Sequence, residues 1–364
     1  MSYTNGLDDP SAHFQTALYT GAGANQTVTN DGNSDLQPDW LWIKRRNAGY
    51  GHVVVDSNRG LGSSNPPYLA TEATDAENSN QNWISGVGTD SFTIGVNEQN
   101  LSNTSGTYVA WQWACNAGST SSNTDGSTTS TVQANTDAGF SIVTYTGTGS
   151  ATTLGHGLGV APAVLIVKNR SRALDWAVYH KDLTDAGYVI ALNSTDAEVD
   201  SGTNRWNHTD PTSSVFSVGS GQQTNQSGDS LIAYCFAEKQ GYSKLGKYVG
   251  NGSGTSDGTF DGPFVYTGFK PAWLMVKASS ASGGDGWNIF DNKRGPINYN
   301  QNKLYADATA AESGAVYDAV DFLSNGFKIR TGRGGANTSG RTYIYMAFAE
   351  NPFTTSTGIP TTAR

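Results

Sequence analysis

The stretch "PDWLWIK", residues 38–44, holds four consecutive apolar residues between a proline-led start and a lysine. The arrangement returns as "PAVLIVK" at 162–168 and "PAWLMVK" at 271–277. None of these stretches alternates apolar with polar residues, which indicates strands buried on both faces. The proline cannot donate to a strand ladder, so we expect it at the first residue of each strand. The sequence therefore predicts one central β-strand that is used three times.

Three further landmarks recur in the same order, which indicates a true repeat. A strand leads into a polar turn in "HVVVDSNRG" from His52 and "WNIFDNKRG" from Trp287, and the middle copy, "WAVYHKDLT", carries His180 in place of the aspartate and lacks the arginine. "TDAE" or "TAAE" follows, and then comes Asn-x-Ser-Gly before an aromatic strand. The recurrent positions are Lys44, Lys168, Lys277, Asp56, Arg59, Asp291, Arg294, Asn103, Gly106, Asn225, Gly228, Asn337 and Gly340.

The proline-to-proline distance is too long for a solenoid repeat and suits a whole β domain. The predicted fold class is all-β, with three tandem antiparallel β-sandwich domains. The predicted boundaries are an N-terminal docking segment at 1–15, repeats at 16–117, 140–241 and 245–353, a Ser/Thr/Gly-rich linker or long loop at 118–139, and a C-terminal tail at 354–364.

The last strand of each repeat separates bulky from mostly small residues. Val109, Trp111 and Trp113 alternate with Ala110 and other small or polar residues, and the other two copies agree. We expect the bulky face to enter a core and the small face to meet a second layer.

Local chemistry gives the recurrent polar positions a structural interpretation. Asn-x-Ser-Gly is typical of a tight turn, because Asn folds onto the backbone and Gly accepts positive φ. We interpret the three lysines as charges at the rim of the core, with Asp56 and Asp291 as candidate partners. Ligand contact by the turn residues is the alternative.

Composition excludes several partners. The 364 residues carry a net charge of −9, which disfavours nucleic acid and anionic membranes. The start lacks a basic, apolar signal peptide, and no apolar run is long enough to span a bilayer. We expect Cys115 and Cys235 to be free, buried thiols.

Candidate chemistry is sparse. The five histidines show no metal-binding spacing, and Asp-rich turns such as "DGNSD" at 31–35 lack the EF-hand spacing, so we predict no metal, no cofactor and no catalytic residue. Recurrent glutamates at the end of the third landmark are one per copy, whereas glycoside hydrolysis needs a carboxyl pair. Trp83 and Trp206 lie on polar loops, where an exposed ring could stack on a sugar. The alternative is that both rings fold back over their own domain.

The four landmarks together resemble the repeats of concanavalin-A-like, SPRY-like β-sandwich proteins in virions of tailed, especially marine, bacteriophages. The opening "GLDDPSAHFQTALYTG" is also similar to such proteins. The resemblance implies a virion protein, made in the host cytoplasm and displayed on a tail fibre, tail tip or capsid, with host-surface carbohydrate as the target. His180 marks where the middle copy has lost a possible site.

We therefore predict a non-enzymatic tail-appendage protein that contributes to host attachment. Its partners would be other virion proteins and copies of itself, a trimer being one form, and Phe14 and Leu18 would be anchors of the docking segment. The alternatives are a capsid decoration or head-fibre protein and a carbohydrate-degrading tailspike that uses Glu77, Glu198 and Glu312. Trp83, Trp206 and His180 are the candidate glycan contacts.

Overall fold

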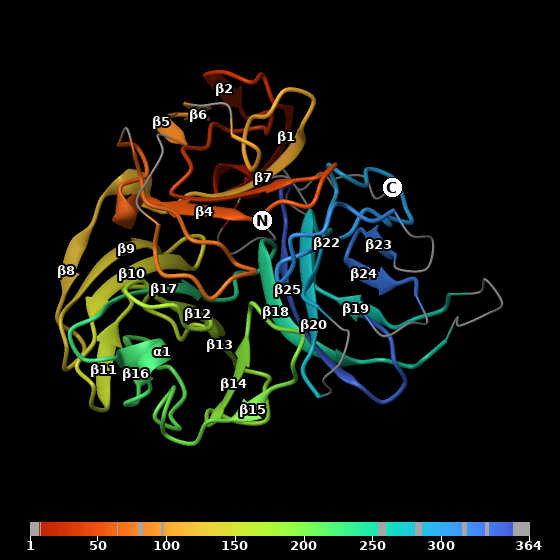
Figure 1. The fold of residues 1–364 in the computed structure, drawn as a ribbon. Coiled ribbons are helices and arrows are strands. Elements are labelled where there is room, and N and C mark those ends of the chain that lie inside the picture. Colours follow the sequence, from red (N-terminus) through yellow and green to blue (C-terminus); the bar gives the residue numbers. More distant parts are fainter. Residues whose placement is uncertain are drawn as a thin grey trace.

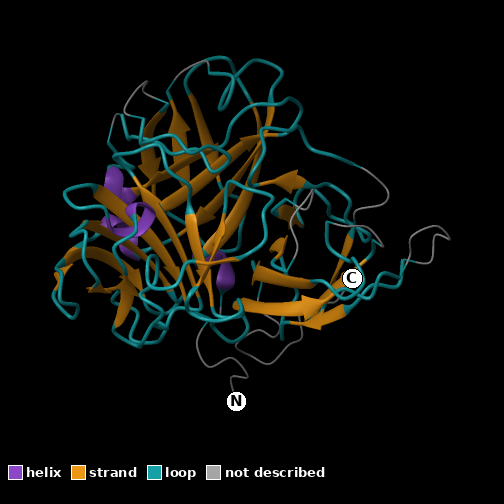
Figure 2. Cartoon of the chain, turned by 60° about the horizontal axis from the view of Figure 1, so that its bottom comes forward, coloured by secondary structure: helices purple, strands orange, loops and turns teal. Residues whose placement is uncertain are grey.

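A computed structural model describes the fold. The described residues are 7, 9–63, 65–78, 83–95, 98–253, 260–280, 286–314, 319–331 and 335–351. They form an all-β structure of antiparallel sheets with a few short helical turns (Figures 1 and 2). The helical elements are η1 (Pro10–Ala12), η2 (Ser57–Arg59), η3 (Asn116–Gly118) and α1 (Gln222–Asn225).

Each repeat contributes one large and one small sheet, which we call sheet pairs 1, 2 and 3 in chain order. In sheet pair 1 the strand orders are β1-β7-β3-β4 and β2-β6-β5. The large sheet contains β1 (Phe14–Thr20), β7 (Thr107–Trp113), β3 (Trp40–Arg45) and β4 (Val53–Asp56); the small sheet contains β2 (Gln26–Thr29), β6 (Ser91–Ile94) and β5 (Ile84–Gly88).

Sheet pair 2 has the largest sheet, of eight strands, in the order β15-β14-β13-β12-β17-β10-β9-β8, and a small sheet β11-β16. The bounds are β8 (Ser121–Asn123), β9 (Ser130–Asn135), β10 (Phe140–Thr146), β11 (Thr152–Gly155), β12 (Val164–Asn169), β13 (Ala177–His180), β14 (Tyr188–Ala191), β15 (Val199–Asp200), β16 (Val215–Val218) and β17 (Ser230–Phe236).

Sheet pair 3 repeats the pattern with the orders β18-β25-β20-β21-β22 and β19-β24-β23. The bounds are β18 (Ser243–Val249), β19 (Phe264–Tyr266), β20 (Trp273–Ala278), β21 (Asn288–Asp291), β22 (Leu304–Tyr305), β23 (Val320–Leu323), β24 (Gly326–Ile329) and β25 (Thr342–Phe348).

The post-proline strands are β3, β12 and β20, and every residue in them is buried, which confirms the prediction. Each lies between the last strand of its repeat and a following strand of the large sheet, as in the β7-β3-β4 order. An unbroken apolar run suits this position, because one face meets the small sheet and the other meets a second core.

The second core is shared by all three sheet pairs. The bulky residues of β7, β17 and β25 belong to one cluster with side chains from every repeat, whereas the small residues between them, such as Ala110, Ala233 and Ala347, belong to three separate clusters, one for each pair. Aromatic rings meet across each boundary: Trp40 and Tyr234 at 4.7 Å, Trp113 and Trp273 at 5.6 Å, and Phe236 and Phe348 at 5.8 Å between centroids. The large sheets therefore face one another around a common centre (Figure 1).

The interpretation of residues 118–139 as a linker or long loop is wrong. β8 and β9 form a hairpin in this segment, and β9 pairs with β10 at the side of the large sheet of pair 2. Asp125 and Gly126 lie in the connection, and Asp-Gly is a strong hairpin signal. Ser and Thr suit an edge strand with one solvated face.

The N-terminal segment also differs from its prediction. Phe14, expected to be a docking anchor, is fully buried in the shared core and contacts Trp113, Trp273 and Phe348. Leu18 is 39% exposed. Residues 1–6 and 8 and the predicted tail at 354–364 lie outside the described residues. Both cysteines are free and buried, as predicted.

Candidate functional site

The Asn-x-Ser-Gly turns connect to the last strand of each repeat, and two of them match. The side chains of Asn225 and Asn337 are buried and donate to the carbonyls of Gly219 and Thr331. Their Oδ1 atoms accept from the backbone N–H groups of Thr148 and Asn251. These amides hold the turn against the loop that opens the repeat, which gives them a structural role.

The first copy is offset by one residue. Thr107, Ser230 and Thr342 pair with Thr20, Thr146 and Val249 at equivalent places, so Ser102 is the counterpart of Asn225 and Asn337. Its Oγ donates to the carbonyl of Ala24. The left-handed position is Ser105, with φ 72°, matching Gly228 and Gly340 at 80° and 76°. The predicted equivalence of Asn103 and Gly106 with the other two copies is therefore wrong by one residue.

Gly106 has another reason to be glycine. A Cβ at this position would lie 2.4 Å from the hydroxyl of Tyr108, whose oxygen accepts from the N–H of Asn103. Close approach of the ring, and not positive φ, therefore excludes a side chain here.

The left-handed positions provide a stability test. We expect Ser105→Gly to raise the free energy of unfolding by roughly 0.5–1 kcal/mol, because it removes the strain of a non-glycine residue in this conformation. Gly228→Ala should lower it by roughly 1 kcal/mol, since no atom lies within 4 Å of the added Cβ and the cost is conformational. Urea unfolding measures both, and a destabilised Ser105→Gly protein would contradict the offset.

The recurrent lysines are buried, so the expectation of rim charges is wrong. Lys44, Lys168 and Lys277 are each 0% exposed and reach into the next sheet pair. Their Nζ atoms donate to the carbonyls of Thr309, Thr74 and Thr195 at 3.0–3.1 Å. Burial lowers the pKa of Lys44 and of Lys168 to about 8. The acceptors belong to the Thr-x-Ala-Glu landmark, so two landmarks form one interlocking contact.

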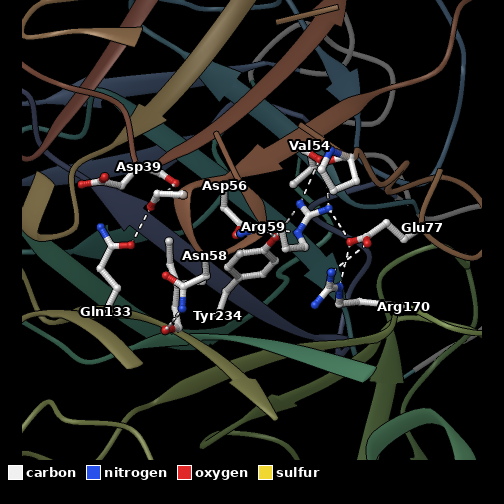
Figure 3. A network of polar contacts seen from close by, with 12 residues as sticks. Asp39, Val54, Asp56, Asn58, Arg59, Glu77, Gln133, Arg170 and Tyr234 are labelled. Carbon is white, nitrogen blue, oxygen red and sulfur yellow. Dashed lines mark hydrogen bonds and ion pairs between the residues drawn. The ribbon is translucent and has the colours of Figure 1, made fainter. Parts of the chain in front are cut away.

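The junction between pairs 1 and 2 is an ionic network (Figure 3). Arg59 bonds to Asp56 at 2.6 Å and to Glu77 at 3.2 Å, and Glu77 bonds in turn to Arg170 of the second pair at 2.7 Å. The hydroxyl of Tyr234, also from the second pair, donates to Asp56 at 2.6 Å. The side chains of Asp56 and Arg59 are fully buried, so each charge depends on its partners.

The junction between pairs 3 and 1 uses the same parts. Arg294 bonds to Asp291 at 2.5 Å and to Glu312 at 3.1 Å, and Glu312 bonds to Arg46 at 2.9 Å. The indole N–H of Trp111 takes the place of the Tyr234 hydroxyl and donates to Asp291 at 2.9 Å.

The junction between pairs 2 and 3 keeps the backbone contacts and changes the charges. The N–H of Glu198 donates to the carbonyl of Ser279, as Glu77 and Glu312 do to Arg170 and Arg46. His180 replaces the aspartate, Leu183 stands where Arg59 stands, and the facing residue is Met346. Met346 offers no hydrogen-bond donor, so an aspartate here would lack the partner that Trp111 and Tyr234 supply.

His180 is therefore a junction residue. Its Nδ1 accepts from the N–H of Asp182, so Nε2 carries the proton and donates to the carbonyl of Tyr345 of the third pair at 3.3 Å. The side chain is 2% exposed, which leaves no surface for a glycan.

His52 is also buried at a junction. Nδ1 accepts from the indole N–H of Trp42, so Nε2 donates to the carbonyl of Tyr305 of the third pair at 2.9 Å. Burial, with the nearby charge of Lys44, lowers the pKa of His52 to about 3. Burial also lowers the pKa of His180 to about 4.

Acid should weaken the junctions through these histidines. Because the folded pKa of His52 lies below the usual 6.5, its contribution to stability is complete above pH 6.5 and is lost as the pH falls toward 3. Between pH 7.5 and 5.0 the loss should be about 2 kcal/mol for His52.

His52→Gln isolates this effect, because a glutamine amide can accept from Trp42 and donate to Tyr305 without titrating. Asp39, whose pKa burial raises to about 6, acts in the opposite sense and is present in both proteins. Urea unfolding at the two pH values should show a smaller loss in the variant. Equal losses in both proteins would refute the assignment.

The two tryptophans proposed as glycan contacts do not present free rings. Trp206 is 1% exposed and packs within the core of pair 2, so the expectation of an exposed ring is wrong for it. Trp83 is partly buried and stacks on Tyr68 at 4.2 Å between centroids. Both rings fold over their own sheet pair, which was the alternative interpretation.

Among the described residues, no group of three or more His, Cys, Asp and Glu residues could hold a metal ion. None of the helices described there is long and apolar enough to cross a membrane. Within "DGNSD", Asp31 pairs with Lys293 at 2.8 Å.

The fold and its junctions define an all-β protein in which three sheet pairs surround one core. The chain belongs to the family described as a domain of unknown function, DUF7483, whose model matches residues 9–352 and so runs through all three pairs. No curated protein and no solved structure matches the chain.

Proposed function

We propose that the chain is a non-enzymatic structural protein of a tailed-phage virion, of tail-fibre or tail-appendage type, which contributes to attachment to host-surface glycans. Its three sheet pairs would be tandem β-sandwich domains of the concanavalin-A-like or jelly-roll kind. The four residue patterns that resemble phage virion repeats support the proposal. Each of them contributes side chains to the shared core or to a junction between sheet pairs.

The observation that carries the proposal is the shared core, together with the polar contacts that join the three sheet pairs around it. The ion pairs Glu77–Arg170 and Glu312–Arg46 join pair 1 to its two neighbours, and each adjoins a fully buried Asp–Arg pair. Buried lysines join every pair to the next. Such a body is rigid, as suits a part of a particle that works outside the cell. Attachment would then use the outward faces of the sheet pairs, because the inward faces are buried in the shared core.

The glutamates favour this proposal over the tailspike alternative. Burial raises the pKa of Glu77, but the hydrogen bonds and charges of Arg170 and Arg59 outweigh it, so the pKa lies below its usual value. A general acid needs a raised pKa and a second carboxyl across the sugar. Glu77 and Glu312 are instead bonded to arginines at different junctions.

Electron microscopy of virions, with gold-labelled antibody against the chain, tests the proposal. We expect label on the tail. Label on the head would favour the capsid decoration alternative, and no label on purified particles would refute the virion assignment. Mass measurement of the purified protein decides whether it is a trimer. A partner is not needed to close the core, because the three sheet pairs of one chain already enclose it.

A further inference from the structure

The small sheet of pair 3 carries two exposed aromatic rings on its outer face. In β19 the side chain of Val265 points into the core of the pair, and its neighbours Phe264 and Tyr266 point outward with 46% and 65% exposure. Because Phe264 and Tyr266 are two positions apart in the strand, their side chains lie on the same face, roughly 7 Å from each other. We call Phe264, Tyr266 and the facing Lys328 the aromatic face.

The other two sheet pairs show that the fold does not require these rings. Val28, Leu154 and Val265 face Phe92, Phe216 and Phe327 in equivalent strand pairs. The positions of Phe264 and Tyr266 are therefore occupied by Thr27 and Thr29 in pair 1, and by Thr153 and Gly155 in pair 2. Of the three pairs, only pair 3 places large aromatic side chains where the other two carry threonine or glycine.

The equivalent faces of the other pairs are also satisfied internally. In pair 1 the hydroxyls of Thr27 and Thr93 bond to each other at 3.0 Å. In pair 2 the hairpin connection packs over β11, where Ser127 bonds to Thr153. The rings of pair 3 keep their exposure, which costs free energy in water unless a ligand covers them.

The surroundings of the rings indicate the chemistry of the ligand. Phe264, Lys328 and Asp321 form one row across the sheet, and Lys328 pairs with Asp261, whose side chain is 72% exposed. Arg330 pairs with Asp321 at 2.9 Å. Two cations and two carboxylates balance, so this face does not select a polyanion.

Gly326 opens the second row of the face. It lies opposite Tyr266, and a Cβ at this position would come 2.1 Å from the backbone carbonyl oxygen of Val265 and 3.1 Å from the ring of Phe264. The absent side chain leaves room for the Phe264 ring beside β24, and both rings lie on the same face of the sheet as Lys328.

We propose that the aromatic face binds a neutral, polyhydroxylated glycan chain. The apolar faces of successive sugar rings stack on Phe264 and Tyr266, and the hydroxyl groups bond to Lys328 and Asp261. This inference deepens the proposed attachment function by naming the surface and the class of ligand, and it replaces the tryptophan loops as the place of contact.

A glycan array with the purified full-length chain tests the inference. We expect binding to neutral glycans by the wild type, and at least about a tenfold loss of affinity in Phe264→Thr/Tyr266→Thr. That variant uses the residues that pair 1 carries at these two positions, so it should fold. Ile297→Thr, which changes an isoleucine that is 72% exposed outside the face, is the matched control and should bind like the wild type.

Other outcomes overturn the inference separately from the function. Binding that survives in the double variant would place the glycan site elsewhere while attachment stands. Binding only to acidic glycans would refute the neutral ligand, and no binding by the wild type would refute the face as a glycan site, whatever microscopy shows of the particle. An oligomer that dissociates only in the double variant, without glycan binding, would instead assign the face to a second copy of the chain.

Discussion

Arg59→Leu is expected to lower the free energy of unfolding by about 3–5 kcal/mol, because it leaves the charge of Asp56 buried without its cation. After the change Asp56 would keep the backbone N–H of residue 59 and the hydroxyl of Tyr234. Neither neutralises a carboxylate that is 0% exposed. Glu77 would retain Arg170, so the loss is concentrated at Asp56.

The chain itself supplies the rescue. The junction between pairs 2 and 3 combines His180, Leu183 and Met346 at the positions of Asp56, Arg59 and Tyr234. Asp56→His/Arg59→Leu/Tyr234→Met transplants that combination and should recover at least about half of the loss, because no charge is left buried without a partner. Tyr234→Met alone must be measured as well, since Tyr234 stacks on Trp40.

Lys181→Ala provides the comparison for an exposed ion pair. Its partner Glu238 lies at 2.7 Å, but both side chains are substantially exposed, and we expect less than about 1 kcal/mol. Urea unfolding of all four variants at pH 7.5 gives the ranking. An Arg59→Leu loss no larger than that of Lys181→Ala would contradict the role assigned to the network.

The sequence predicted those features that depend on local pattern. Unbroken apolar runs after proline place β3, β12 and β20, and the alternation of bulky with small residues in β7 correctly separates two faces. Both signals arise within a few neighbouring residues, where strand geometry alone decides which side chains share a face.

Burial of polar residues could not be predicted in the same way. Lys44 and Lys168 look like rim charges until the carbonyls of Thr309 and Thr74, far away in the chain, are brought beside them. His180 looks like an altered site for the same reason. A local signal was available at Asp125 and Gly126, where the dipeptide indicates a hairpin. The one-residue offset at Ser105 gave no such signal, because the letters Asn-x-Ser-Gly match in every copy.

Long-range contacts also decide what the bulky faces of the large sheets pack against. Each face could have closed a sandwich of its own, but the small faces already pack against the small sheets. The bulky rings are left to pack against one another, so the three repeats share a core that no repeat completes alone.

The shared core predicts that the three sheet pairs unfold together. Trp113→Ala should cost about 3–5 kcal/mol, because the indole is 1% exposed and contacts rings of pairs 1 and 3. The loss should also appear in pair 2, which the mutated residue does not belong to. Leu18→Ala, on the same sheet and 39% exposed, should cost much less.

Cys235 reports the state of pair 2, since it is a free thiol buried in the core of that pair. In a Cys115→Ala background, a thiol reagent labels Cys235 only when pair 2 opens. If the core is shared, Trp113→Ala shifts the urea midpoint of labelling by the same amount as the midpoint of global circular dichroism. If each pair is an independent domain, the labelling midpoint stays where it was while the signal from pair 1 moves.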